Sequence, residues 1–333
     1  MHEIFSQLTE AERERLKQTD QPDFVQPMRA TLVHEHFSDP GWIYERKLDG
    51  ERCLLRKKGD EVTLHSRNEI RKNRTYPEIA EALARLSGNF ILDSEIVTFE
   101  GGLTSFKRLQ NRTHTRDPEP SLMRKVPVHA YVFDLLYFED RDLRRLPLRR
   151  RKNLLRRALG FRDPIRFLPH RNEHGEDYLA EACGKGWEGL IAKEADSAYV
   201  SSRSKKWLKF KCGRRQELVI GGFTDPEGER VGFGALLLGY FEEDDFHYAG
   251  RVGTGFDNAF LESFREQLDR IEQEGTPFVD FDSDDKTIHW AKPQYVGEIG
   301  FTEWTNDNRL RHPRFLGLRD DKVPREVGKE QPS

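Results

Sequence analysis

KLDGER, residues 47–52, places a nucleophile, an acid and a phosphate-binding cation around a single turn, in Lys47, Asp49 and Arg52. In the preceding GWIYERKL, the period of two predicts that Glu45 and Lys47 project from one face of a strand. A plain hairpin is the simplest alternative, because Asp-Gly is a favoured turn pair. Two polar groups that point together off a strand, next to a glycine turn, suit a pocket better than a solvated edge. The stretch therefore indicates covalent nucleotidyl transfer through Lys47.

A nucleophilic Lys47 needs surroundings that free its lone pair, because a free lysine, with a pKa of about 10.4, is almost fully protonated at neutral pH. KKWLKFK is predicted to be a strand that carries Lys209 and Lys211 on one face together with Trp207. These two lysines and Arg52 could supply the positive charge. The alternative is an ordinary polar face on a half-buried strand.

Carboxylates and one aromatic residue stand in other strand patterns. ILDSEIVTF puts Asp93 and Glu95 on one strand face, and EGLIAKE carries Glu188 and Lys193, whose odd separation predicts opposite faces unless a bulge intervenes. Carboxylates in apolar strands are costly unless they meet a cation, a metal or a ribose hydroxyl. Any one of them could form a structural salt bridge, but three together favour a nucleotide site. In YVFD, Phe133 could stack on a base, or it could belong to a core strand.

Composition limits the class of protein. The 333 residues suffice for two domains, and 34% charged against 36% hydrophobic residues with a formal charge of -3 indicate a soluble, highly charged globular protein. No apolar run has the length of a membrane span, and the N-terminus lacks a signal-peptide pattern, so a cytoplasmic location is expected. Cys53, Cys183 and Cys212 are few, odd in number and widely spaced, which argues against a disulfide framework and a structural zinc site. A metal would be held by oxygen.

Charge is strongly segregated along the chain. Residues 141–157, 201–215 and 306–319 are basic, whereas residues 242–245 and 280–285 are acidic. An isolated basic run is usually a solvated helix face. Three such runs flanking candidate phosphate chemistry favour a polyanionic partner.

The patterns predict an α+β protein in three parts. Residues 1–25, with a capping box at Thr9 and Glu12 and a short helix to about Lys17, are interpreted as an appendage. Residues 26–212 alternate strands and helices, which predicts a domain of antiparallel sheets with flanking helices. Residues 213–333 change to short β runs with one helix near 257–274, which suggests a small barrel. The predicted elements of the middle part are strands at 91–99, 128–138, 188–194 and 205–211, a hairpin around Gly59 and Asp60, and helices in TYPEIAEALARLSG, PLRRRKNLLRRALG and EDYLAEACGKG.

These segments, taken in order, resemble the motifs of the covalent nucleotidyltransferase superfamily, and specifically of an ATP-dependent DNA ligase. The segments are KLDGER, SRNEIRKN, ILDSE, YVFD, EGLIAKE and KKWLKFK, with SFKRLQNR between the third and the fourth. The C-terminal half adds GFGALLLGY, AGRVGTGF and FTEWTNDNRLRHPRFLGLRDDK, which are similar to the oligonucleotide-binding (OB) barrel of the ligase component of bacterial ligase D. The resemblance covers residues 27–322 and implies a nucleotidyltransferase (adenylation) domain followed by an OB-fold domain.

The resemblance also implies roles for individual residues. Lys47 would attack the α-phosphate of ATP and become lysyl-AMP, and Asp49 matches the acid of the first motif. Glu45 would help to read adenine, Phe133 would stack on it, and Leu48 and Lys193 would also contact the nucleotide. The phosphate and ribose would be held by Arg52, Arg67, Glu95, Lys209 and Lys211; Glu95 and Glu188 would place Mg²⁺ or Mn²⁺; Arg319, Asp320, Asp321 and Lys322 would lie in the segment that closes over ATP. Which of the two aspartates in that segment matters more stays open.

The resemblance further implies the substrate and the biological context. The chain would seal nicks in double-stranded DNA in repair or end joining, and it would act as a monomer. A Ku-type protein and separate polymerase and nuclease components would be candidate partners. Two departures from the family pattern stand at Ser94 and Glu69, where related enzymes commonly have glycine. The alternatives are an RNA ligase, a capping-type guanylyltransferase, a nicotinamide-dependent ligase, and a non-catalytic nucleic-acid-binding barrel with a degenerate transferase domain. The last would predict loss of Lys47 or the carboxylates, and none is lost.

Overall fold

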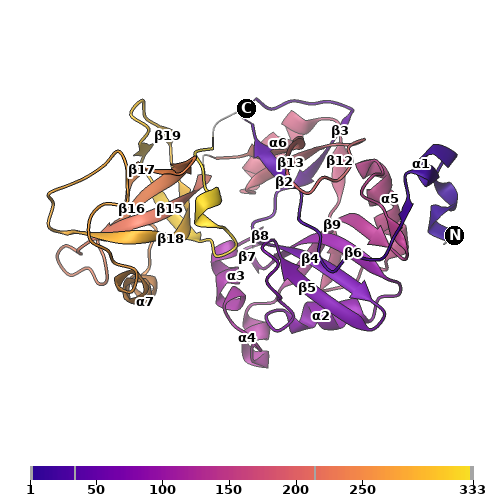
Figure 1. Cartoon of the computed structure of the whole chain (residues 1–333), viewed down its shortest axis with the longest axis horizontal. Coiled ribbons are helices and arrows are strands. Elements are labelled where there is room, and N and C mark those ends of the chain that lie inside the picture. The colour runs from indigo at the N-terminus through magenta and orange to yellow at the C-terminus, as the bar shows by residue number, and fades with distance from the viewer. Residues whose placement is uncertain (1–2, 34, 214, 331–333) are drawn as a thin grey trace. The chain divides into compact units, whose positions relative to one another are not determined.

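The structure, a computed structural model, describes residues 3–33, 35–213 and 215–330, and its internal contacts divide the chain into two compact units. The first unit ends at Cys212 and the second begins at Gly213. Both units combine β-sheets with helices (Figure 1). None of the helices in the described residues is long and apolar enough to cross a membrane.

Two large sheets form the first unit. The seven-stranded sheet has the order β1 (Lys17–Gln18), β10 (Arg141–Asp142), β9 (His129–Phe138), β6 (Phe90–Val97), β4 (Glu51–Lys58) and β5 (Glu61–Ser66), with β11 (Ile165–Phe167) parallel to β9. The five-stranded sheet has the order β12 (His170–Asn172), β3 (Trp42–Arg46), β13 (Gly189–Glu194), β14 (Arg203–Lys211) and β2 (Arg29–Leu32). A small pair is formed by β7 (Phe99–Glu100) and β8 (Leu103–Thr104). The predicted hairpin is confirmed, since β4 and β5 turn at Gly59 and Asp60.

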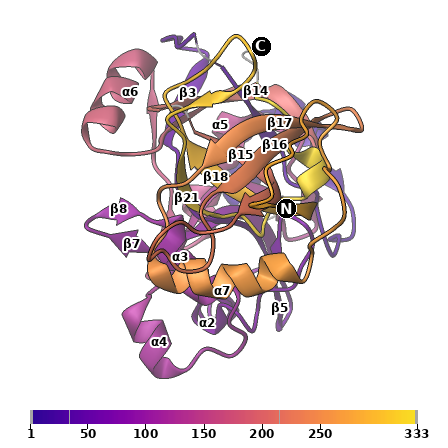
Figure 2. The same ribbon diagram turned by 90° about the vertical axis from the view of Figure 1, so that its left-hand side faces the viewer.

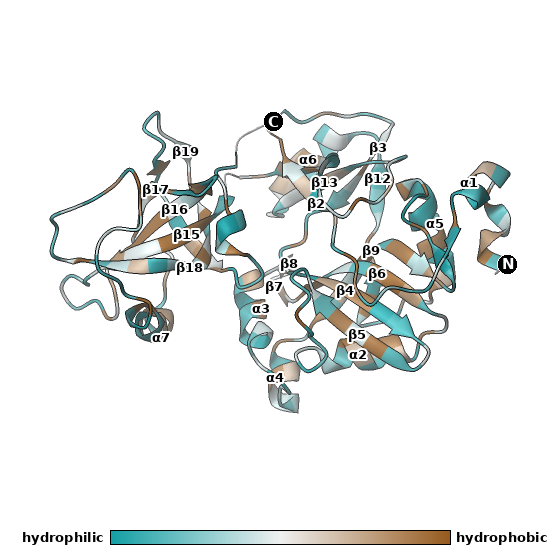
Figure 3. Cartoon of the chain, viewed as in Figure 1, coloured by the Kyte–Doolittle hydropathy of each residue, from teal (hydrophilic) through white to brown (hydrophobic). Residues whose placement is uncertain are grey.

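Helices cover the outer faces of these sheets (Figure 1). The helices of the first unit are η1 (Glu3–Gln7), α1 (Glu10–Glu14), α2 (Pro77–Ala84), α3 (Phe106–Thr113), α4 (Pro120–Lys125), α5 (Leu148–Ala158) and α6 (Gly175–Gly184). Side chains of α2 and α5 share one core with the seven-stranded sheet, and those of α6 share another with the five-stranded sheet. A third cluster, which contains Phe133 of β9 and Trp207 of β14, joins the facing sides of the two sheets. Figure 3 shows the corresponding hydrophobic bands on the strands and the hydrophilic colour of much of α5.

The KLDG turn is not a hairpin. It links β3 of the five-stranded sheet to β4 of the seven-stranded sheet, so the chain crosses from one sheet to the other. Gly50 lies so close to β6 that an added Cβ would be 2.3 Å from the carbonyl oxygen of Ile96. Any larger residue would push the turn that presents Lys47 away from β6.

The N-terminal segment belongs to the first unit, and the interpretation of residues 1–25 as an appendage is wrong. The capping box between Thr9 and Glu12 is confirmed, but the helix ends at Glu14 and β1 then pairs with β10. Phe5 and Leu8 are buried in the same core as α2 and α5. Its few apolar residues are spread over several short elements, so no local pattern in the sequence indicates their burial.

The second unit is built on one antiparallel sheet. Its order is β17 (Asp245–Val252), β16 (Leu236–Glu242), β15 (Arg215–Thr224), β18 (Ile288–Gly300) and β21 (Arg314–Leu318), and the remaining elements are α7 (Asn258–Asp269), β19 (Glu303–Trp304), β20 (Leu310–Arg311) and η2 (Pro324–Glu326). The predicted helix is confirmed as α7, which is capped by the Asp257 side chain. Leu261, Phe264 and Leu268 bury one side of α7 in the core of this sheet. The course of α7 is seen in Figure 2.

The strands of the second unit do not pair into a closed barrel. Within residues 215–330, β17 and β21 form the two edges of the sheet, and no ladder joins them. The small barrel predicted from the sequence is therefore found here as an open sheet. Strand lengths and turns predict a meander, but closure depends on whether the two edge strands meet, which a local pattern does not encode.

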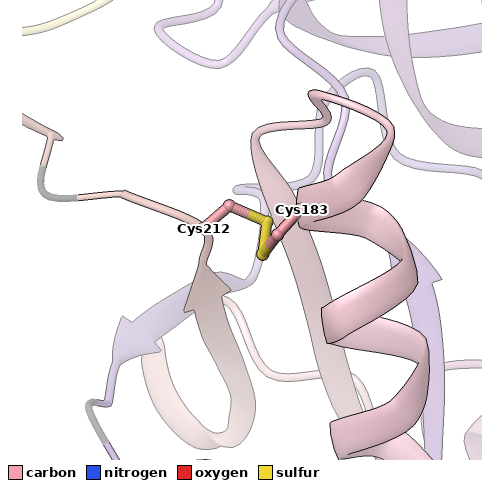
Figure 4. Close-up of a disulfide and its surroundings, with 2 residues drawn as sticks. All are labelled: Cys183 and Cys212. Atoms are coloured by element: carbon pink, nitrogen blue, oxygen red, sulfur yellow. A yellow bond between two sulfur atoms is a disulfide. The ribbon is translucent and has the colours of Figure 1, made fainter.

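Cys183 and Cys212 form a disulfide, with their Cα atoms 5.1 Å apart (Figure 4). The expectation from cysteine number and spacing gave no cross-link, and it is wrong for this pair. Cys183 lies near the end of α6 and Cys212 directly follows β14, 29 positions later in the sequence. The packing of α6 on the five-stranded sheet brings the two side chains together. Cys53 is free and buried.

The substitution Cys183→Ser is expected to lower the free energy of unfolding by about 3 kcal/mol, because the cross-link restricts a loop of this size in the unfolded chain. The measurement is denaturant unfolding with and without a thiol reductant. The reductant should destabilise the wild type by a similar amount and leave Cys183→Ser unchanged. A wild type whose unfolding is indifferent to the reductant would contradict the disulfide.

Candidate active site

Lys47 directly follows β3, and one contact holds its backbone while another holds the end of its side chain. Its backbone N–H donates to the carbonyl oxygen of Gly189 at 2.9 Å. Its Nζ forms an ion pair with Glu188 Oε1. The side chain of Lys47 is 18% exposed and that of Glu188 is 4% exposed, so the pair is largely withdrawn from water while Lys47 stays reachable.

Glu188 reaches Lys47 because the regular alternation of side chains between the two faces of the sheet is interrupted at Gly189, the first residue of β13. Gly189 has φ 144°, and a Cβ there would lie 2.0 Å from the carbonyl oxygen of Phe210. Opposite faces were the prediction for a strand without a bulge; the irregular backbone at Gly189 lets both Glu188 and Lys193 reach the site. The sequence signal for this irregularity was the glycine directly after Glu188, at the first position of β13.

Arg52 is clamped by Asp93, a residue that the roles taken from the sequence did not include. Arg52 Nε lies 2.5 Å from Asp93 Oδ1, and Nη2 lies 2.6 Å from Oδ2. The Tyr199 hydroxyl donates to the same carboxylate at 2.7 Å. Burial alone would lower the pKa of Arg52, but the Asp93 carboxylate outweighs it and the pKa is raised. The clamp fixes a permanent cation over the Phe133 ring, 4.6 Å from its centroid.

Glu45 is buried between two ammonium groups. Lys152 Nζ donates to its Oε1, and Lys193 Nζ lies 2.6 Å from its Oε2. Burial would raise the pKa of Glu45, but the two lysines outweigh it and the pKa is lowered. Lys193 also lies over the rings of Phe133 and Trp207, at 4.2 and 3.9 Å from their centroids. The two sheets thus bring Glu45, Lys193 and Phe133 into one cluster.

Part of the basic run at residues 141–157 is buried, so the expectation of a basic surface is wrong for Arg151 and Lys152. Arg151 forms a two-pronged ion pair with Asp134, both contacts at 2.8 Å, and Lys152 bonds to Glu45. The sequence does contain a signal that these two side chains are buried. Arg151 and Lys152 have helical spacing to Leu148 and Leu155, which places them on the apolar stripe of α5.

The remaining predicted residues of the first unit lie around Lys47. The register of β13 and β14 sets Lys211 opposite Gly189 and Lys209 opposite Ile191, and the predicted shared face with Trp207 is confirmed, since Leu208 and Phe210 pack into the other core. Asp49 Oδ2 accepts from the N–H of Phe106 at 3.4 Å, at the start of α3. Leu48 is buried between the sheets.

Ser94 and Glu69 occupy the two positions where the family commonly has glycine. The Ser94 hydroxyl donates to the carbonyl oxygen of Cys53 at 2.6 Å, so it faces away from Arg52 and Glu95. Glu69 has φ 62° in the turn after Arg67, which β5 presents at its end. The turn therefore keeps the left-handed conformation that favours glycine.

Glu69→Gly is expected to stabilise the chain by about 0.5 to 1 kcal/mol, because a side chain in the left-handed region is strained and glycine is not. The measurement is the denaturant midpoint. Glu69→Ala removes the same carboxylate without relieving the backbone, so it should not share the gain. Equal midpoints for the glycine and alanine variants would exclude backbone strain at this turn.

Glu95 and Glu188 are the two carboxylates predicted to place a divalent cation. Glu95 lies opposite Arg52 in the register of β4 and β6, and Glu188 contacts Lys47. In the part of the chain that the structure describes, no group of three or more His, Cys, Asp or Glu side chains could hold a metal by itself. Two carboxylate donors fit Mg²⁺, which usually takes one or two carboxylates and completes its shell with water and phosphate oxygens.

The predicted residues of the second unit form their own ion-pair network. Arg319 binds Asp321 through two contacts of 2.9 Å and Glu298 through one of 3.0 Å. Burial would raise the pKa of Asp321, but the Arg319 guanidinium outweighs it and holds the pKa at about 2. Lys322 pairs with Glu217 at 3.0 Å. Of the two aspartates, Asp321 is the buried one that orients Arg319, whereas Asp320 is exposed.

A lysine presented beside acids and clamped cations, on a first unit of two facing sheets, is the arrangement expected of a nucleotidyltransferase. The profile of the ATP dependent DNA ligase domain matches residues 24–211, and that of the ATP dependent DNA ligase C terminal region matches residues 229–322. The chain belongs to the ATP-dependent DNA ligase family. The resemblance found in the sequence is confirmed.

Within this family the chain is similar to ligase D proteins. It is 38% identical over 324 residues to the multifunctional non-homologous end joining protein LigD of Pseudomonas aeruginosa, covering 95% of this chain and 38% of that protein. It is 36% identical over 335 residues to the LigD of Mycobacterium tuberculosis, covering 95% and 42%. The chain thus spans about two fifths of the length of these relatives. A solved structure, mycobacterial DNA ligase D complexed with ATP and MES, has a TM-score of 0.65 at 33% identity and covers 91% of this chain and 97% of that one.

Proposed function

We propose that this chain seals 5'-phosphate/3'-hydroxyl nicks in double-stranded DNA through a lysyl-AMP and a DNA-adenylate intermediate. The observation that carries the proposal is the Lys47 ammonium, presented between two sheets and paired with Glu188. Membership of the family identifies the chain as an ATP-dependent DNA ligase. No contact in the described residues favours an RNA ligase or a capping enzyme.

In the first stage Lys47 Nζ attacks the α-phosphate of ATP, a bond forms between nitrogen and phosphorus, and pyrophosphate leaves. Before the attack the ammonium must give up a proton, and Glu188 Oε1 is the neighbouring acceptor. Glu45, Leu48, Phe133 and Lys193 would contact the base. The phosphates and the ribose would be held by Arg52, Arg67, Glu95, Lys209 and Lys211. Asp49, tied to the start of α3, would fix the turn that presents Lys47.

Glu95 and Glu188 would hold Mg²⁺ or Mn²⁺, which when bound neutralises phosphate charge. In the second stage AMP passes from Lys47 to the 5'-phosphate of the nick. In the third stage the 3'-hydroxyl attacks that phosphate and AMP leaves. Both stages are displacements at phosphorus, in which cations such as Arg52, Lys209 and Lys211 stabilise the developing charge.

We infer that the second unit is an OB-type domain whose edges come together beyond the regular strands. The N–H of Phe315 in β21 donates to the carbonyl oxygen of Thr254, two residues past β17, at 2.9 Å, and the rings of Phe256 and Phe315 are 4.8 Å apart. Arg319, Asp321 and Lys322 would close over ATP and orient the pyrophosphate, and the unit would then rotate to hold DNA. An identical distance between the two units in the ATP-bound and DNA-bound states would exclude the rotation.

The biological setting is also a proposal. The LigD names of the relatives support a role in DNA repair by end joining. A Ku-type end-binding protein, separate polymerase and nuclease components, a monomeric state and a cytoplasmic location fit this role.

The proposal is tested by incubating the protein with labelled ATP, GTP or NAD and a divalent cation, followed by denaturing electrophoresis and peptide mapping. Label from ATP alone, on the peptide that contains Lys47, is the expected result. Nick sealing on DNA and on RNA-containing duplexes then identifies the substrate. An absent adduct, or an adduct on another lysine, would refute the mechanism.

A further inference from the structure

Lys152 is a buried ammonium group with three protein acceptors. It lies in α5 and is 1% exposed. Its Nζ donates to Glu45 Oε1, to the carbonyl oxygen of Phe133 at 3.2 Å and to that of Leu168 at 3.1 Å. An ammonium group has three hydrogens, so these contacts use its full donor capacity.

Two of these acceptors belong to residues that the proposed function assigns to the nucleobase. Lys152 therefore joins the Glu45 side chain on β3 to the Phe133 backbone on β9, across the two sheets. Such a cross-link sets the carboxylate relative to the aromatic ring. Burying this charge is costly, and the arrangement is stable only because every donor is satisfied.

We propose that Lys152 is a positioning residue for base selection: it holds the Glu45 carboxylate and the Phe133 ring in one arrangement that accepts a base with an amino group at C6. This inference rests on the proposed function, in particular on Glu45 and Phe133 as the base contacts. A carboxylate only accepts hydrogen bonds, so it pairs with the amino group of adenine and repels the oxo group of guanine.

The second oxygen of Glu45 is the one that can turn to the base. Lys193, which contacts this oxygen, has a pKa lowered to about 8. Burial lowers the pKa most, the attraction of Glu45 offsets this only in part, and repulsion from Lys152 lowers it further. A shared carboxylate between two buried lysines leaves one excess positive charge. In the proposed arrangement Oε1 stays on Lys152, and the base takes the place of Lys193 at Oε2.

The test is the rate of labelled adduct formation on Lys47 as a function of nucleotide concentration, with ATP and with purine riboside triphosphate, which lacks the 6-amino group. Lys152→Met is expected to raise the KM for ATP about tenfold to a hundredfold, as for loss of a hydrogen bond to a charged group, and to change the KM for the purine analogue less than about threefold. The maximal rate at saturation should change little. Equal changes in KM for ATP and for the purine analogue would overturn the proposal.

Two further variants separate positioning from folding. Lys72→Met breaks another lysine–carboxylate pair of the first unit, Lys72 with Glu51 at 2.6 Å, and should leave the ratio of the KM values for ATP and the analogue unchanged. Glu45→Gln/Lys152→Met removes both charges and carries the test if Lys152→Met does not fold. It should show the same nucleotide ratio as Glu45→Gln alone, and an additional loss in the ratio would overturn the proposal. If the wild type forms no adduct with ATP, the proposed function fails, which is a different outcome.

Discussion

Lys47→Ala is expected to reduce adduct formation with ATP by at least about 10⁴-fold, while sealing of a nick that already carries AMP on its 5'-phosphate stays within about tenfold of the wild-type rate. The reason is that the nucleophile itself is lost for the first stage, whereas the third stage uses the 3'-hydroxyl of the DNA. The fold should be kept, because the Lys47 side chain is 18% exposed and belongs to none of the three hydrophobic clusters described for the first unit. The measurements are labelled-ATP electrophoresis and single-turnover sealing of a pre-adenylated nick.

Lys58→Ala, a lysine on an exposed part of β4, is the control and should form the adduct at the wild-type rate. An adduct on Lys47→Ala at the wild-type level would show that another residue is the nucleophile. Equal loss of both activities would show that Lys47 also serves the later stages, contrary to the division of labour proposed for it.

Local patterns were sufficient to predict the elements on which the site is built. The β4–β5 hairpin, the face shared by Trp207 and the two lysines after it, and the capping box at Thr9 follow from turn residues, alternation and side-chain capping within a few residues. The roles of single residues came instead from the ordered motifs of the family. No period in the sequence distinguishes Lys47 from another lysine at the end of a strand.

Contacts between distant strands could not be predicted in the same way. Lys152 and Glu45 are 107 positions apart, and Lys47 and Glu188 are 141 apart, so their pairing depends on strand order and on the crossing between sheets. For the same reason the basic composition of residues 141–157 indicates a surface, although helical spacing places Arg151 and Lys152 on the apolar stripe. Closure of the second unit likewise depends on where the ends of the sheet meet.

Asp93→Asn is expected to lower the maximal rate of adenylation about 10²-fold to 10³-fold and to cost about 3 to 5 kcal/mol of stability, as for loss of one partner of a buried ion pair. Asparagine keeps the shape of the side chain but cannot bind Arg52 through two charged oxygens. Arg52 would then be free to leave the Phe133 ring and would stabilise the phosphate less well. The measurement is single-turnover adduct formation at saturating ATP, corrected for the folded fraction by denaturant unfolding.

The chain offers a matched control for this effect in Asp134→Asn. Asp134 binds Arg151 with the same two-pronged geometry, at 2.8 Å for both contacts, and both side chains are fully buried. Arg151 donates its remaining bonds to the carbonyl oxygens of Leu146 and Ser197, so it supports the fold and has no assigned contact with the nucleotide. Both variants should lose similar stability, but only Asp93→Asn should lose the larger part of its rate per folded molecule. Equal losses of rate in the two variants would show that the Arg52–Asp93 pair acts through the fold alone, and that Arg52 does not act on the phosphate.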